Sequence, residues 1–244
     1  MINHFQTQGG SGGPQGILNP FFIEDVKLSS SAFDARYDNA RSSVFQFKQK
    51  VGNANKFQGN IHASILESAI TLEGPLSKNK KTTFLASGRK SYFEILRAAV
   101  DAPFLPNYWD FHTKITHKIN DKTTLNFIGI GAIVDFKFVR AKNITTERLY
   151  QLNANASIQQ WNYTLGESLK RSISNGFWNL ALSRTRFNNN LQKYEDNENP
   201  TEATQILDFV SNETETKLRF DVNKFTNGWK IGLWSLYPTG RMRQ

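Results

Sequence analysis

Four histidines are the side chains in this 244-residue sequence that are best suited to metal chemistry. His112 and His117 are five residues apart, and on an extended strand an odd spacing puts them on opposite faces, so they cannot ligate one metal ion together. His4 and His62 have no Asp, Glu or Cys at ligand spacing, whereas a metal site needs three or four ligands. We therefore expect no metal site and no cofactor.

Motifs for nucleophilic or nucleotide chemistry do not stand out either. Gly129 and Gly131 lie within a predicted strand and open no helix, so they are not a dinucleotide fingerprint. No acid–base pair can be placed in one cleft from its spacing. The carboxylates suit a solvated strand face or a loop. The sequence predicts a protein that is not an enzyme.

Composition narrows the class of protein. With no cysteine, a disulfide framework and a thiolate zinc site are excluded. A net charge of +9 would suit nucleic acid or an anionic membrane surface. The basic residues are spread over predicted turns and strand faces, and no compact basic run is interleaved with aromatics, which argues against nucleic acid. An aromatic content of 13% favours half-buried strands over a helical globule.

Alternation of apolar and polar residues runs through most of the chain from residue 57 onward. It is clearest from Trp109 to Ile119, where apolar and polar side chains alternate. The same period predicts nine strands, at 57–65, 70–76, 82–92, 109–119, 123–138, 152–173, 177–194, 214–223 and 229–237. No apolar run approaches the ~18 residues of a membrane-spanning helix.

The connections between these strands alternate in length. Short turns are predicted at 77–81, 120–122, 174–176 and 226–228, the last two built on Asn-Gly. Longer loops are predicted near 93–107, with one helical turn at 94–100, and at 139–150 and 195–210. The hairpin at 66–68 is an exception. Short turns on one side and long loops on the other are typical of outer-membrane barrels.

The stretch from Pro20 to Lys50 has a different organisation. It predicts two short strands, Ile23–Leu28 and Ser43–Lys48, joined by a bend in which Asp38 and Asn39 tolerate positive φ. The glycine-rich residues 1–19 before it fit a flexible linker and a tightly turning loop equally well.

Motifs in two regions resemble the TonB-dependent outer-membrane receptors. Ile23, Val26, Ala35-Arg36-Tyr37-Asp38-Asn39 and Ser42-Ser43-Val44 resemble the end of that family's plug domain, with Asp38 where glycine is usual. The first barrel strands of the family are similar to Glu73-Gly74-Pro75-Leu76, Gly88-Arg89-Lys90-Ser91-Tyr92, Leu105-Pro106-Asn107-Tyr108-Trp109-Asp110-Phe111 and Lys114, with Lys90 where arginine is usual. The resemblance covers about residues 15–140.

The resemblance implies an all-β fold class, a partial transmembrane antiparallel β-barrel of about nine up-and-down strands preceded by the C-terminal part of a plug domain. Residues 1–52 would be the end of the plug and 53–244 the start of the barrel, with Val51–Asn55 as the link. Nine strands are fewer than the 22 of large outer-membrane transporters. We therefore expect a fragment of a longer receptor, or a truncated product.

The implied function is energy-coupled uptake of a metal chelate, a vitamin or a glycan across the outer membrane of a Gram-negative bacterium. The implied partners are outer-membrane lipid, the TonB complex (whose binding box is not in this sequence), a small nutrient ligand and a surface lipoprotein. Nucleic acid is not among them. Two alternatives remain, a soluble all-β carbohydrate-binding module and a passive porin or adhesin barrel without a plug.

Candidate site residues follow from the two faces of the strand 109–119. Its polar side chains would line the barrel lumen, at Asp110, His112, Lys114 and Lys118. Its apolar side chains would face lipid, at Trp109, Phe111 and Ile115. Arg36 and Arg41 are candidates for polar contacts between plug and barrel wall, because charges inside a barrel need partners, with a solvated turn as the alternative.

Aromatic residues near the predicted strand ends suit the interfacial girdles of a membrane barrel. They are Tyr92, Tyr108, Trp109, Phe136, Phe138, Trp178, Tyr194, Trp229 and Tyr237. Packing at the core and rim of a soluble sandwich is the alternative, because aromatics favour any sheet.

Overall fold

The computed structural model describes residues 16, 18–30, 37, 43–92, 101, 104–140, 142–197, 199–227 and 229–243. This part of the chain forms two antiparallel sheets, one of two strands and one of nine. The expected bend at Asp38 and Asn39, the helical turn at 94–100, and the candidate residues Arg36 and Arg41 lie outside the described residues.

The small sheet is the predicted hairpin. After the short helix η1 (Pro20–Phe22), β1 (Ile23–Ser30) pairs with β2 (Ser43–Gln49) from Ile23 opposite Gln49 to Ser30 opposite Ser43. Asn19 caps η1, since its Oδ1 accepts a hydrogen bond from the backbone N–H of Phe21 at 3.0 Å. The two predicted strands and their pairing are confirmed.

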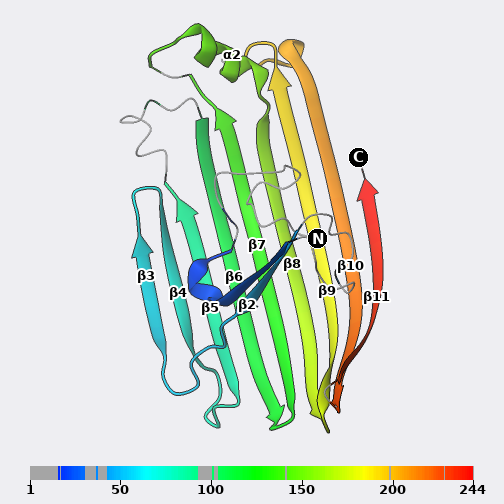
Figure 1. Ribbon diagram of the computed structural model, residues 1–244. Coiled ribbons are helices and arrows are strands. Elements are labelled where there is room, and N and C mark those ends of the chain that lie inside the picture. Colours follow the sequence, from blue (N-terminus) through cyan, green and yellow to red (C-terminus); the bar gives the residue numbers. More distant parts are fainter. Residues whose placement is uncertain are drawn as a thin grey trace.

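The large sheet contains the nine predicted strands in chain order. They are β3 (Gln58–Ala63), β4 (Glu67–Pro75), β5 (Thr82–Ser91), β6 (Phe104–Asn120), β7 (Thr123–Phe138), β8 (Ser157–Ile173), β9 (Gly176–Tyr194), β10 (Gln205–Thr226) and β11 (Trp229–Arg243). Each strand pairs antiparallel with the next, as Figure 1 shows. β3 and β11 are the edges, so the sheet of the described residues is open, as expected for part of a barrel.

The connections are sorted to the two ends of the sheet as predicted. The turns after β4, β6, β8 and β10 lie at the lower end in Figure 1, and the longer connections that include helix α2 lie at the upper end. Asn175 and Asn227, each followed by glycine, have φ of 56° and 45° in two of the short turns. Positive φ at asparagine before glycine is typical of tight hairpin turns.

One helix was missed by the sequence reading. Residues 146–150 were predicted to be loop and 152–154 strand, whereas Thr146–Ala154 form helix α2. Thr145 caps it by accepting a hydrogen bond from the backbone N–H of Arg148 at 3.3 Å. The negative charge of Glu147 in the first turn also stabilises the helix, because it lies at the positive end of the helix dipole. Among the described residues, no helix is long and apolar enough to cross a membrane.

Asp101 ties the chain before β6 to the loop before α2. Its carboxylate accepts hydrogen bonds from the backbone N–H groups of Lys142 at 2.5 Å and Asn143 at 3.1 Å, and it lies 2.8 Å from a guanidinium nitrogen of Arg148. The two backbone donors, helped by the arginine, hold the pKa of Asp101 below its usual range. Two long connections are thereby joined at the upper end of the sheet.

The last two strands are longer than predicted. β10 begins at Gln205, within the expected loop, and β11 continues past Tyr237 to Arg243. Pro238 lies within β11, although proline cannot donate a ladder hydrogen bond. β11 is an edge strand, where proline is tolerated.

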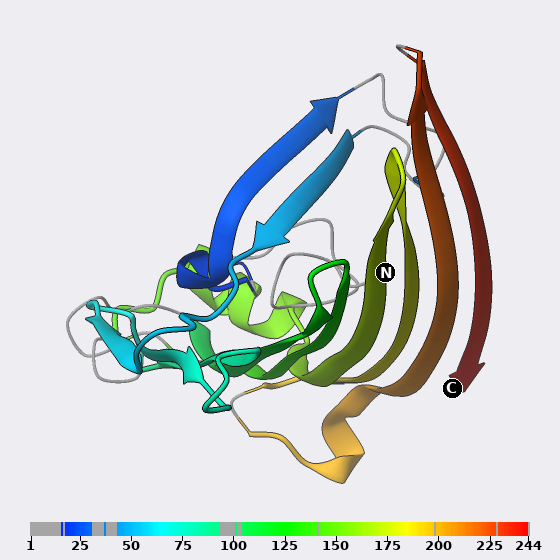
Figure 2. The same cartoon turned by 90° about the horizontal axis from the view of Figure 1, so that it is seen from below.

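The large sheet is curved, and the small sheet lies on its concave side (Figure 2). We call this side the inner face and the other the outer face. The alternation along β6 follows the two faces, because Asp110, His112 and Lys114 are buried whereas Trp109 and Phe111 are 44% and 46% exposed. Residues directly opposite each other on neighbouring strands point to the same side of the sheet, so the register extends these two faces from β4 to β11.

We predict that Gly52→Ala destabilises the fold. A Cβ atom at Gly52 would lie 2.1 Å from the carbonyl oxygen of Phe84, so the link between the two sheets would have to move off β5. The expected loss is about 2 kcal/mol of unfolding free energy, measured by denaturant titration in detergent micelles. Gly88→Ala is the control, since its nearest contact would be an ordinary 3.8 Å. Equal stability of the two variants would contradict the close approach.

Candidate functional site

A buried ion pair joins β5 and β6 on the inner face. Arg89 and Asp110 are cross-strand partners, and Nε of the arginine donates to Oδ2 of the aspartate at 2.8 Å. A second guanidinium nitrogen lies 2.7 Å from the same oxygen. Both side chains are almost fully buried, at 5% and 1% exposure. Charges buried this deeply persist only when paired and hydrogen-bonded.

Glu67 and Tyr108 extend the ion pair into a cluster. Glu67 on β4 places Oε2 3.4 Å from Arg89, and the Tyr108 hydroxyl donates to the same oxygen at 2.5 Å. The Arg89 guanidinium also lies over the Tyr108 ring, 5.7 Å from its centroid. Tyr108, buried on the inner face, therefore does not belong to an outer aromatic girdle, and that expectation is wrong.

The segment before the small sheet docks onto this cluster. Arg89 donates to the backbone carbonyl of Gly16 at 2.5 Å. Nearby, the Asn19 amide donates to Ser87 Oγ at 2.5 Å and to Thr71 Oγ1 at 3.4 Å. The strands β4 and β5 thus hold Gly16 and Asn19 through hydrogen bonds.

Two further inner-face residues of β6 touch the small sheet. The ring of Phe22, the last residue of η1, meets His112 edge-on with centroids 5.2 Å apart and ring planes at 86°. Lys114 donates from Nζ to the backbone carbonyl of Gln49, at the end of β2, at 3.0 Å. One ring contact and one charged hydrogen bond therefore fix both ends of the hairpin base.

Three of the four predicted lumen residues are thus brought together. Asp110, His112 and Lys114 lie in a row on the inner face. His112 contacts Phe22 and Lys114 contacts Gln49, whereas Asp110 is linked to Gly16 through Arg89. Lys118 is exposed beside the short turn after β6, where the register shifts before Asn120. That these residues line the lumen of a closed barrel stays a prediction.

The sequence reading missed the centre of the cluster. Alternation along each strand puts the side chains of Arg89, Glu67 and Tyr108 on the inner face. Which residues lie opposite one another, however, depends on the register between the strands. The connection between β5 and β6 is long, so the pairing of Arg89 with Asp110 could not be counted from the sequence. The signal that the sequence did offer for this ion pair was a cationic and an anionic residue on two successive strands.

Further pairs of opposite charge continue along the inner face of β10. Lys217 lies 2.9 Å from Glu215, and Arg219 binds Asp221 through two nitrogens at 2.8–3.0 Å. The described residues include no group of three side chains that could hold a metal ion. Chemically, the inner face is a polar, charge-paired surface suited to holding another segment or a polar solute.

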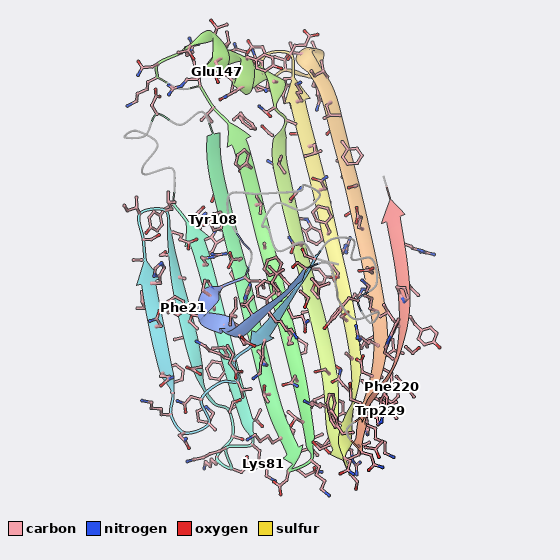
Figure 3. The ribbon with its side chains drawn as sticks, in the orientation of Figure 1. Phe21, Lys81, Tyr108, Glu147, Phe220 and Trp229 are labelled. Atoms are coloured by element: carbon pink, nitrogen blue, oxygen red, sulfur yellow. The ribbon has the colours of Figure 1, made fainter. Side chains whose placement is uncertain are left out.

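The outer face has the opposite character. Large apolar side chains point outward along β6 to β11 and are more than a third exposed, namely Trp109, Phe111, Leu125, Ile133, Leu165, Leu180, Leu182, Leu218, Phe220, Ile231 and Leu233. Glu167 on β8 is an exception. Near the short turns, the Trp178 and Phe220 rings lie 6.2 Å apart, and Figure 3 shows Phe220 and Trp229 at this end, opposite Glu147.

Comparisons with known proteins bear on this two-faced sheet. No protein-family model and no curated protein matches the sequence. Among solved structures, a mutant of the ferric enterobactin receptor PfeA from Pseudomonas aeruginosa matches 95% of this chain with a TM-score of 0.70 and 12% identity. The siderophore receptor PirA from Acinetobacter baumannii matches 90% with a TM-score of 0.67 and 14% identity.

The pyoverdine outer membrane receptor FpvA from Pseudomonas aeruginosa PAO1 matches 99% of the chain with a TM-score of 0.66 and 13% identity. The fold is that of a TonB-dependent receptor. The chain spans 38%, 35% and 40% of the lengths of these three receptors. Because the matches to PfeA and FpvA cover 95% and 99% of this chain, the similarity extends over both the curved sheet and the small sheet on its concave side.

We predict that Arg89→Met strongly destabilises the chain. Removing the guanidinium leaves Asp110 and Glu67 as buried carboxylates without a counter-charge, at an expected cost of about 3–5 kcal/mol. Denaturant unfolding in detergent micelles measures the difference. Lys217→Met is the matched control, since its pair with Glu215 is partly exposed and worth under about 1 kcal/mol. If both variants lost the same stability, the cluster would not be the anchor.

Proposed function

We propose that the chain is part of a TonB-dependent receptor in the outer membrane of a Gram-negative bacterium. Residues 1–52 are the C-terminal part of the plug, and residues 53–244 are the first part of the barrel wall. The observation that carries the proposal is the division of the large sheet into a charge-paired inner face, which binds the segment 16–49, and an apolar outer face.

The outer face argues against a soluble carbohydrate-binding module. A soluble protein rarely exposes a contiguous apolar surface larger than a few hundred Å². Here the exposed apolar side chains follow one another across six neighbouring strands, β6 to β11. A membrane wall needs such a surface, and it needs every backbone group paired between strands.

The inner contacts argue against a passive barrel without a plug. Gly16, Asn19, Phe22 and Gln49 all contact side chains of the wall. Four contacts spread over 34 residues of chain, from position 16 to position 49, fix a folded segment rather than a passing loop. We infer from these contacts that the segment is part of a plug.

Within the three substrate classes, we infer a metal chelate. The receptors described above are named for ferric enterobactin, a siderophore and pyoverdine. Uptake is energy-coupled through the TonB complex, and a surface lipoprotein is a further partner of the complete receptor. The role is transport and not catalysis, in keeping with receptors as the structural neighbours.

The experiment that tests this function is deletion of the gene in its source organism, followed by ⁵⁵Fe uptake from ferric siderophores. We expect loss of uptake for at least one siderophore, restored by the intact gene, because an outer-membrane barrier admits large chelates only through a dedicated receptor. Uptake of a vitamin and of a glycan provides the matched controls and should not change.

Two outcomes would overturn the proposal. Unchanged uptake of every siderophore, with loss of glycan or vitamin uptake, would assign another substrate class. Purification of the chain as a folded monomer without detergent or lipid would contradict the membrane wall itself and favour the soluble module.

A further inference from the structure

Three arginines stand together on the outer face, on the α2 side of the apolar residues Leu182 and Leu218. Arg184 and Arg186 belong to β9, and Arg241 belongs to β11. In the register of the sheet, Arg186 lies opposite Thr214, which in turn lies opposite Arg241. Arg184 occupies the neighbouring row with Thr216 and Thr239. Three cations thus share two adjacent rows of one face.

The arginines line a shallow hollow with neutral polar side chains between them. Its remaining lining is Asn212, Thr214, Thr216, Thr239 and Gly240. The Thr239 hydroxyl donates to the backbone carbonyl of Thr216 at 3.5 Å, and Asn212 accepts from the Asn188 amide at 3.1 Å. Hydroxyl and guanidinium donors around a hollow are a set suited to a multivalent oxyanion.

None of the three arginines forms an ion pair with a carboxylate among the residues that the structure describes. By contrast, Arg89 is paired with Asp110, and Arg219 with Asp221. Glu213 and Glu215, the β10 carboxylates level with the cluster, lie on the inner face. Glu167 of β8 shares the outer face one row from Arg184, but no ion pair joins the two side chains. Arg186 instead lies over the indole of Trp161, 5.3 Å from its centroid. The cluster is therefore a patch of positive charge whose arginines bind no carboxylate among the described residues.

The position of the patch along the strand is informative. Arg184 and Arg186 follow Gly176 by 8 and 10 residues, which is about 26–33 Å at roughly 3.3 Å per residue. A strand tilt of about 40° makes this about 20–25 Å across the membrane, near the ~25 Å height of an apolar band. Between the turn and the arginines, β9 presents Trp178, Leu180 and Leu182 outward.

Aromatic residues mark the same level. Trp161 and Tyr163 on β8 are outward, with ring centroids 6.1 Å apart and ring planes at 7°. Tyr163 is the cross-strand partner of Arg186. Trp and Tyr concentrate where hydrocarbon meets headgroups. The arginines therefore lie at that boundary, on the side of the long connections.

We propose that Arg184, Arg186 and Arg241 bind the phosphate groups of a phosphorylated lipid headgroup in the leaflet at the α2 end of the wall. This inference rests on the proposed membrane location. Guanidinium groups bind phosphate through paired N–H donors, and the apolar side chains of β9 and β10 below them accommodate the acyl chains. A lipid satisfies both features, whereas free phosphate would use only the arginines.

The test compares two triple variants of the full chain in neutral-detergent micelles. Arg184→Gln, Arg186→Gln and Arg241→Gln remove the patch. Lys122→Gln, Arg171→Gln and Lys224→Gln remove three exposed charges near the short turns at the other end of the wall. The probes are a bis-phosphorylated diglucosamine lipid, its dephosphorylated form and inorganic phosphate, with bound lipid counted by native mass spectrometry.

We expect the phosphorylated lipid to bind the parent chain and the control, with at least roughly tenfold weaker binding to the patch variant. The dephosphorylated lipid should bind all three chains equally and weakly. Equal affinity of the patch and control variants for the phosphorylated lipid would overturn the proposal, and so would inorganic phosphate binding as tightly as the lipid.

Flotation with neutral-lipid vesicles separates this inference from the proposed function. If the chain floats with the vesicles but the two triple variants bind lipid alike, only the phosphate site is wrong. If neither the parent chain nor the variants insert into vesicles, the membrane location is wrong, and the phosphate site falls with it.

Discussion

The alternation of side chains along the extended backbone is the constraint on which the rest of the structure depends. An extended strand must send successive residues to opposite faces. In β6 this puts Trp109 and Phe111 on one face and Asp110 and His112 on the other. The nine strands keep this division through an almost unbroken register, so one surface suits lipid and the other suits water and charge.

The inner face shows how the charges are accommodated. Asp110 is nearly inaccessible, and it is stable there because Arg89 faces it directly across the strand pair. The same arginine reaches the carbonyl of Gly16, so one side chain both neutralises the wall and holds the segment inside it. The segment is held by hydrogen bonds from Asn19 and Lys114 and by ring contacts of Phe22 with His112 and of Phe21 with His62.

Much of the fold could be predicted because its signals are local. The period of two located all nine strands, and Asn175 and Asn227 before glycine marked two of the turns. Helix α2 was missed because the apolar residues around Leu149 and Leu152 were assigned to a loop and a strand, although Thr145 and Glu147 carried a capping signal. β11 continues beyond its predicted end at Tyr237, and it tolerates Pro238 because it is an edge strand, which no local pattern shows.

The candidate site was predictable only in part. Alternation correctly grouped Asp110, His112 and Lys114, but the partners Arg89, Glu67 and Tyr108 come from register, which a long connection hides. Tyr108 was assigned to a girdle because it lies near a strand end. It is two residues from Asp110 on the same strand, so alternation puts both side chains on the inner face. Arg184 and Arg186 are two apart on one strand, so alternation puts them on one face, but their approach to Arg241 depends on the register of β9, β10 and β11.

The most direct test of the two-faced wall is a nitroxide scan of β6. The chain has no cysteine, so single cysteines at positions 109 to 115 can be spin-labelled one at a time and placed in lipid bilayers. Labels at 109, 111 and 115 should collide often with oxygen and rarely with a water-soluble nickel chelate, while labels at 110, 112 and 114 should be shielded from both. Equal accessibility of odd and even positions, or nickel access at 109 and 111, would contradict the account.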